Sequence, residues 1–232
     1  MRLLNAVSVA VVVPYGGNCR YRERAWAWVK ARYSAEHPEW ELVEARATTE
    51  EWCKGAALNP VIETRDAEIV IQADADVWCD GLVDAVAAVE AGASWAAPHK
   101  LVRRLSEEGA EAVLAGADWR DQETEQRPYE GLLGGGILVA PRDVLRDAPL
   151  DCRFKSWGQE DESHAFALSA LYGDPWRGKA DLLHLWHPPQ PRQSRRKGSR
   201  ESWKLRRRYF EARRNPEAIR VLLEEGRCPQ SA

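Results

Sequence analysis

The stretch 69–78 constrains this chain more than any other, because it places two carboxylates at the end of an apolar segment. Its first residues are mainly β-branched, as in a buried strand of an α/β sheet. Asp74 and Asp76 follow, and residues i and i+2 of a regular strand share a face. Mg²⁺ and Mn²⁺ prefer such oxygen ligands and complete their shell with substrate phosphates. The stretch predicts a strand that ends at a metal site; the simpler alternative for a lone acidic pair is a turn or a helix cap with Asp80.

Strand and helix patterns alternate around this stretch. We expect strands at 4–13, 39–45, 68–77, 93–97, 137–140 and 180–186, and helices at 20–34, 48–65, 82–91 and 105–115 and through 165–171. Such alternation is typical of an α/β fold with a Rossmann-like, mostly parallel central sheet flanked by helices. Ligands of such sheets bind at the carboxyl ends of the strands.

Composition favours a soluble globular protein. The chain has 232 residues, of which 44% are apolar, enough for one large domain or one domain with an appendage. The apolar run at 7–13 is too short to span a bilayer and leads into a Pro-Tyr-Gly-Gly turn rather than a cleavage site, so we expect no transmembrane segment and no secretion. The five cysteines are odd in number, scattered and without a CxxC pair, which argues against a disulfide framework and favours a cytoplasmic location.

Charge is distributed unevenly along the chain. Residues 192–214 hold eleven Lys or Arg and two Glu, whereas the whole chain has a formal charge of -3. An acidic body therefore carries a basic C-terminal segment, for which we expect mainly helix. A solvated helix face is the ordinary explanation; peripheral contact with a polyanion, a phosphate or an anionic membrane surface is the alternative.

Two further groups of residues have chemistry suited to a site. Glu160 and Asp161 follow Trp157-Gly158 at the expected start of a helix, where a carboxylate can accept a proton from a bound hydroxyl. An ordinary acidic first turn is the alternative. His184 and His187 end an expected strand, and imidazole is a metal ligand, although a lone histidine is more often a surface or core residue.

The order of these motifs resembles that of the metal-dependent glycosyltransferases with the GT-A fold. Within them, the chain is similar to the group that contains the β-1,4-galactosyltransferases, the chondroitin polymerase domains and the polypeptide GalNAc-transferases, over about residues 6–190. Pro14 and Tyr15 match the end of the first strand, where the nucleobase usually lies. Lys54 matches the basic residue that reaches the nucleotide. The loop 16–20 lacks the basic run of the galactosyltransferases.

The resemblance also implies roles for the acids and glycines. Asp74 and Asp76 match the DxD metal motif, and Gly135 and Gly136 match the glycine pair beside the donor sugar. The segment Trp-Gly-Gln-Glu-Asp-Glu is similar to the WGGEDxD/E signature, with Gln159 in place of a glycine. In that signature Trp157 and Glu160 would bind the acceptor, and Asp161 would be the general base of the inverting members.

The HLWH segment at 184–187 resembles the region of the third metal ligand. Comparison of spacing with the GalNAc-transferases favours His187, whereas strand alternation allows His184. The implied ion is Mn²⁺ or Mg²⁺.

The implied activity is transfer of a sugar from a nucleotide-diphosphate sugar, with a UDP-sugar favoured, to a hydroxyl of a glycan, a lipid-linked sugar, a protein or a modified nucleic acid. We expect a glycosyltransferase domain at 1–190 and a basic extension at 191–232 that closes as a lid, in which Arg195, Arg196 or Lys197 reaches the diphosphate. A sugar-nucleotide nucleotidyltransferase is one alternative. A non-catalytic polyanion-binding module is another.

Overall fold

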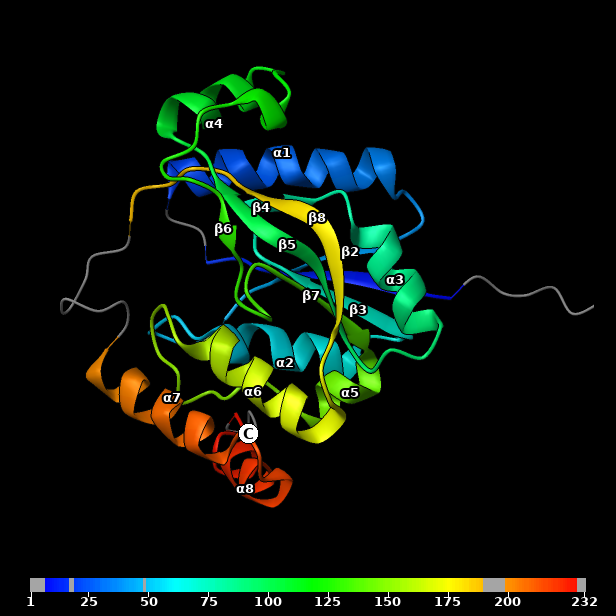
Figure 1. Cartoon of the computed structure of the whole chain (residues 1–232), viewed down its shortest axis with the longest axis vertical. Coiled ribbons are helices and arrows are strands. Elements are labelled where there is room, and N and C mark those ends of the chain that lie inside the picture. Colours follow the sequence, from blue (N-terminus) through cyan, green and yellow to red (C-terminus); the bar gives the residue numbers. More distant parts are fainter. Residues whose placement is uncertain (1–6, 17–18, 48, 190–198, 229–232) are drawn as a thin grey trace, which may run out of the picture.

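A curled mixed sheet forms the centre of the fold, with helices on both of its faces (Figure 1). The structure is a computed structural model that describes residues 7–16, 19–47, 49–189 and 199–228. Within these ranges the strands are β1 Val9–Pro14, β2 Glu41–Ala45, β3 Ile69–Ala73, β4 Val77–Cys79, β5 Ala96–Arg104, β6 Tyr129–Glu130, β7 Ile137–Pro141 and β8 Trp176–His184. The helices are α1 Arg20–Glu36, α2 Lys54–Thr64, α3 Leu82–Glu90, α4 Glu107–Leu114, α5 Arg142–Asp147, α6 Glu160–Tyr172, α7 Arg200–Ala212 and α8 Pro216–Glu225, with a short 3₁₀ turn at Trp119–Asp121.

The strands lie in the order β2-β1-β3-β7-β5-β8-β4, and β6 pairs with β5. Strand β1 is parallel to β2 and β3, and β5 is parallel to β8, whereas β4, β6 and β7 run antiparallel to their partners. The α/β class and the flanking helices are confirmed, and the sheet is mixed rather than mostly parallel. Parallel neighbours need a crossover connection, and the helix-rich alternation that supplies it loosens beyond residue 104.

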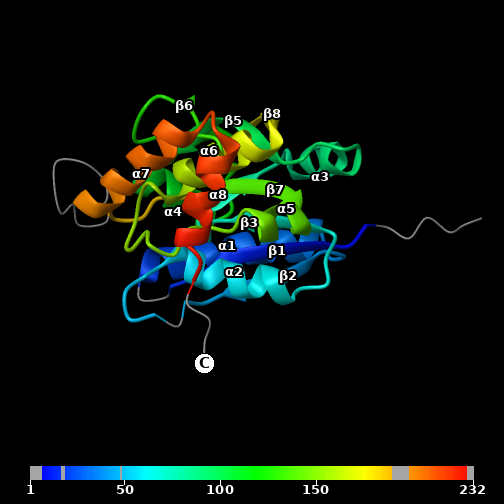
Figure 2. The ribbon, with the colours of Figure 1, turned by 90° about the horizontal axis from the view of Figure 1, so that it is seen from below.

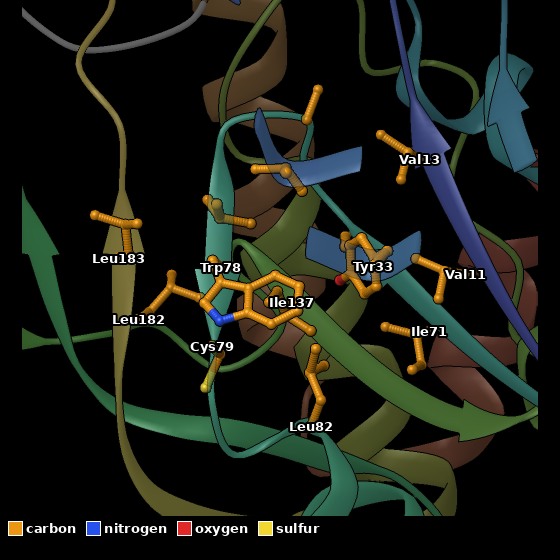
Figure 3. Packing of buried hydrophobic residues seen from close by; sticks show 14 of the residues in the cluster. Val11, Val13, Tyr33, Ile71, Trp78, Cys79, Leu82, Ile137, Leu182 and Leu183 are labelled. Atoms are coloured by element: carbon orange, nitrogen blue, oxygen red, sulfur yellow. The ribbon is translucent and has the colours of Figure 1, made fainter. Parts of the chain in front are cut away.

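The alternation of side chains along β1 divides the interior into two cores. Val11 and Val13 point to one face and pack with Tyr33 of α1, Ile71 and Trp78 (Figure 3). The intervening residues of β1 face the second core, which α2, α5 and α6 cover together with α7 and α8. Both cores pack against the same strands, so close packing on two faces fixes the position of the edge at which β1 and β3 end.

The expected single strand at 68–77 is interrupted. Strand β3 ends at Ala73 and β4 begins at Val77, so Asp74 and Asp76 lie in a tight turn between them. The prediction that both carboxylates share one strand face is wrong. The turn lets β4 leave β3 and pair instead with β8, and it sends the two side chains to different partners.

The C-terminal helices α7 and α8 pack on α6 at the side of the body away from α1 (Figures 1 and 2). Asp151 anchors them: its carboxylate is buried and accepts hydrogen bonds from the Tyr209 hydroxyl (2.9 Å) and the Arg153 guanidinium (2.6 Å). Next to it, Cys152 and Cys228 form a disulfide. The cysteine pattern argued against disulfides, and for this pair that expectation is wrong, because packing of α8 brings together residues 76 apart in sequence.

Some of the predicted features lie outside the described residues. Residues 190–198, with Arg195, Arg196 and Lys197 of the expected lid, lie outside the described ranges, as does the expected domain boundary at 190. Both stay predictions. Among the helices of the described ranges, none has the length and apolar character needed to cross a membrane. The cytoplasmic location also stays a prediction.

Candidate active site

Asp76, His184 and His187 converge at one end of the sheet. Each offers one ligand atom, and these atoms lie within 4.8 Å of one another. The register of β4 and β8 explains the meeting: Val77 pairs with His184, and the amide of Leu185 donates to the carbonyl of Asp76 at 2.8 Å. The acid and the imidazoles therefore come from segments about a hundred residues apart, joined by a short antiparallel ladder.

The backbone around the two histidines presents their Nε2 atoms to the cluster. The Nδ1 of His184 lies 2.9 Å from the carbonyl of Leu185, and the Nδ1 of His187 lies 2.9 Å from that of Pro188. A neutral imidazole that donates through Nδ1 keeps a lone pair on Nε2. Burial lowers the pKa of His184 to about 4 and also lowers the pKa of His187, so both rings are neutral near pH 7. One carboxylate with two neutral imidazoles is a donor set that suits Mn²⁺ better than Mg²⁺.

Asp76 is held as an anion. It is 5% exposed, and burial by itself would raise its pKa, but the two imidazoles, which gain charge only as the pH falls, and Arg22, which is always charged, more than offset that effect and lower its pKa from the ordinary 3.8. Its Oδ2 lies 3.4 Å from Nε2 of His187. These two atoms are spaced as neighbouring ligands of one small ion would be.

Lys54, at the start of α2, bridges the carboxylates of Asp74 and Asp161. Its ammonium lies 2.8 Å from Oδ1 of Asp74 and 2.8 Å from Oδ1 of Asp161, and its side chain is buried. Burial alone would lower the pKa of Lys54, but Asp161, Asp74 and Glu160 reverse the effect and raise it. Lys54 thus ties the turn after β3 to the first turn of α6.

Glu160 lies beside this bridge, and few favourable contacts offset the burial of its carboxyl group. It is 6% exposed, and its Oε2 has no hydrogen-bond partner within the described residues. Burial and repulsion from Asp161, partly offset by Lys54, raise the pKa of Glu160 to about 7. A buried carboxyl oxygen without a partner is well suited to receive a hydroxyl of a bound molecule.

The glycines at 134–136 bring β7 close to these acids. The carbonyl of Gly136 accepts from the amide of Asp74 at 2.8 Å. Gly134 and Gly136 have φ of +77° and +76°, and a Cβ on Gly136 would lie 2.7 Å from Leu182. A Cβ on Gly135 would meet nothing nearer than 3.4 Å. The run is therefore fixed by backbone conformation and close packing at its ends, with Gly135 the open member.

Known proteins resemble this chain in fold rather than in sequence. No family model matches the chain, and no curated protein matches it. Glucosyl-3-phosphoglycerate synthase from Mycobacterium tuberculosis, solved with Mn²⁺, UDP-glucose and phosphoglyceric acid, aligns with a TM-score of 0.53 and 14% identity over 90% of this chain and 80% of that one. GalNAc-T7, solved with UDP, GalNAc and Mn²⁺, aligns with a TM-score of 0.55 and 10% identity over 97% of this chain and 56% of that one. The chain has the GT-A fold.

Pro14, Tyr15 and Trp157 are three further predicted site residues. Pro14 ends β1 and Tyr15 follows it, and β1 is parallel to β3, so both residues lie at the same edge of the sheet as Asp74. The guanidinium of Arg46 lies 4.8 Å from the Tyr15 ring. Trp157 stacks on Trp52, with ring centroids 5.2 Å apart and planes 20° from parallel. Within the described ranges, the structure thus brings Pro14, Tyr15, Lys54, Trp157, the acids and the two histidines to one edge of this GT-A fold.

Arg22 of α1 is a site residue that the sequence did not single out. Its Nε lies 3.3 Å from Oδ2 of Asp76, its Nη2 lies 3.3 Å from Nε2 of His187, and its guanidinium lies 4.2 Å from the Trp157 ring. One signal was present in the sequence: Arg20, Arg22 and Arg24 crowd the start of a helix, where the helix dipole disfavours cations. A cation at a helix N-terminus therefore needs an anionic partner from outside its own helix, which for Arg22 is Asp76.

Proposed function

We propose that this protein is a metal-dependent glycosyltransferase that moves a sugar from a nucleotide-diphosphate sugar to an acceptor hydroxyl with inversion. A UDP-sugar is the favoured donor, since the two solved structures described above were obtained with UDP or UDP-glucose and Mn²⁺. The observation that carries the proposal is the convergence of two groups of side chains from distant segments. In one group Asp76 lies beside His184 and His187. In the other, Lys54 joins Asp161 to Asp74.

On the donor side, Asp76, His187 and His184 would hold Mn²⁺ or Mg²⁺, with Asp74 acting directly or through water. The bound ion would neutralise charge that develops on the leaving nucleoside diphosphate. Lys54, which is paired with Asp74, would add a positive charge beside it. Pro14 and Tyr15 would flank the nucleobase, and the open Gly135 with Gly136 would let the donor sugar approach the backbone.

On the acceptor side, Asp161 would take the proton from the attacking hydroxyl. It stands in the first turn of α6, where the helix dipole favours an anion, and 28% of its side chain is exposed, so that a hydroxyl can reach it. Lys54 fixes one oxygen of Asp161 and leaves the other available. Glu160 would accept a second hydroxyl, and Trp157 would offer an aromatic face to the sugar.

Donor hydrolysis tests the proposal without knowledge of the acceptor. The protein with Mn²⁺ is incubated with a panel of UDP- and GDP-sugars, and released nucleoside diphosphate is measured. Release from one donor, abolished by chelation and restored by Mn²⁺, is the expected result. Release of pyrophosphate instead would favour nucleotidyl transfer. Absence of turnover together with steeply salt-dependent binding of polyanions would favour a non-catalytic module.

Replacement of the base tests the division of roles. Asp161→Asn should lower the transfer rate by about 10²–10⁴-fold, the usual contribution of a general base, while nucleotide affinity changes little. Asp84→Asn is the matched control, because Asp84 is an exposed acid in the first turn of α3. Full turnover by Asp161→Asn would show that the base is another group.

A further inference from the structure

Arg22 is hydrogen-bonded to two of the atoms that a metal ion would need as ligands. Its guanidinium donates to Oδ2 of Asp76 and to Nε2 of His187, each at 3.3 Å, and those two acceptor atoms lie 3.4 Å apart. Nδ1 of His187 faces the carbonyl of Pro188, so Nε2 offers its lone pair to Arg22. A divalent ion binds oxygen and imidazole nitrogen at about 2.1 Å through the same lone pairs. The two cations therefore compete for the same ligands.

Charge makes this competition strong. The cluster contains one carboxylate and two imidazoles, and its interior is shielded from water: Asp76 is 5% exposed and the Arg22 side chain 16%. Arg22 alone neutralises Asp76. A divalent ion added beside Arg22 would leave a net positive charge in a partly desolvated site, which is unfavourable.

The surroundings of Arg22 allow it to leave. It stands in the first turn of α1, where the helix dipole repels a cation, and its stem is long and flexible. Its guanidinium also lies over the face of Trp157, at 4.2 Å. Departure of the guanidinium would uncover that face, which belongs to the acceptor side of the proposed active site.

We propose that Arg22 is the resident cation of the metal-free site: it holds Asp76 and His187 together, and the divalent ion must displace it from both before binding. This inference rests on the proposed function for the identity of the ion. It makes Arg22 a positioning residue that keeps the ligands assembled and sets the metal affinity of the enzyme in the absence of nucleotide.

The test measures Mn²⁺ binding to the full chain without nucleotide, by calorimetry or by the electron paramagnetic resonance of free Mn²⁺. Arg22→Met keeps an apolar stem against Trp157 and removes the charge. Because a charge-assisted hydrogen bond no longer has to be broken, this variant should bind Mn²⁺ about ten to a hundred times more tightly than the wild type. Arg22→Lys keeps the charge without the two-pronged geometry and should lie between the two.

Arg104→Ala controls for net charge. Arg104 lies opposite His184 in the β5–β8 pair and acts on the same three groups, but its side chain is paired with Glu125 at 4.0 Å rather than with the ligand atoms. Its loss should change Mn²⁺ affinity by less than about threefold, because the ion breaks no hydrogen bond of Arg104 and solvent and salt weaken the effect of a partly exposed charge. An equal gain for Arg104→Ala and Arg22→Met would overturn the inference, since general electrostatics would then account for both.

Thermal unfolding gives a second readout. Without Mn²⁺, Arg22→Met should unfold at a lower temperature than the wild type, because Asp76 is left buried without its cation. Saturating Mn²⁺ should raise its Tm by more than that of the wild type. Equal or weaker Mn²⁺ binding by Arg22→Met refutes the inference. Failure of Mn²⁺ to bind any of these proteins refutes both this inference and the metal dependence of the proposed function. Tighter binding without sugar-nucleotide turnover supports the role of Arg22 and counts against the transferase alone.

Discussion

The buried Glu160 should make the stability of this protein depend on pH in a way that one substitution removes. Its pKa rises from the ordinary 4.5 to about 7 because of burial and the neighbouring Asp161. The folded state therefore binds a proton more tightly than the unfolded chain does. The corresponding stability is fully present below the unfolded value of 4.5 and is lost as the pH rises through 7.

The size of the effect follows from the shift. At about 1.4 kcal/mol for each pKa unit, ionisation of Glu160 at pH 8 lowers the free energy of unfolding by about 3 kcal/mol. At pH 5 the loss is about 1 kcal/mol, because most of the folded protein is still protonated there. Glu160→Gln keeps the shape of the side chain and cannot ionise. The stability of the variant relative to the wild type should therefore increase by about 2 kcal/mol between pH 5 and pH 8.

Thermal unfolding at these two pH values, without metal or nucleotide, measures this difference. For a chain of this length about 2 kcal/mol corresponds to a change in Tm of about 4–8 °C. Glu217→Gln is the control, since Glu217 is an exposed acid in the first turn of α8, and its effect should be nearly the same at both pH values. If the change in stability caused by Glu160→Gln were also independent of pH, the conclusion that burial disfavours the ionised form of Glu160 would be refuted. The stabilised variant should at the same time bind acceptor less well.

Two further substitutions test local features of the fold. Gln159 has φ of +82°, a left-handed conformation that costs a side chain about 1 kcal/mol, so Gln159→Gly should raise Tm by about 2–4 °C in a scanning fluorescence assay. Gln122→Gly, at φ of -88°, should lower it instead, and a loss of stability at both positions would contradict the strain. Arg153→Met leaves Asp151 buried without its cation and should lower the free energy of unfolding in urea by about 3 kcal/mol, whereas Tyr209→Phe should cost about 1–2 kcal/mol. Equal, small losses for both would show that Asp151 is not an anchor.

Several secondary-structure elements and the chemical groups of the site could be predicted from the amino-acid sequence. Strand β1 and helices α1 and α6 follow from local periodicity and turn residues, which depend on neighbours a few positions away. The order of Asp76, Asp161 and the two histidines likewise indicated a site, because each lies at the end of an element. These features are local, so the chain alone reveals them.

The pairing of the charged groups, in contrast, becomes visible only in the folded chain. The turn at 74–76 separates two acids that a single strand would have placed together, and it aims one at Lys54 and the other at Arg22. Strand pairing sets His184 opposite Val77. Such contacts depend on the register and direction of strands far apart in the sequence, and one-dimensional periodicity does not specify them. The acidic stretch at 69–78 thus indicated where the site lies, whereas folding brought Lys54 to Asp74 and Arg22 to Asp76.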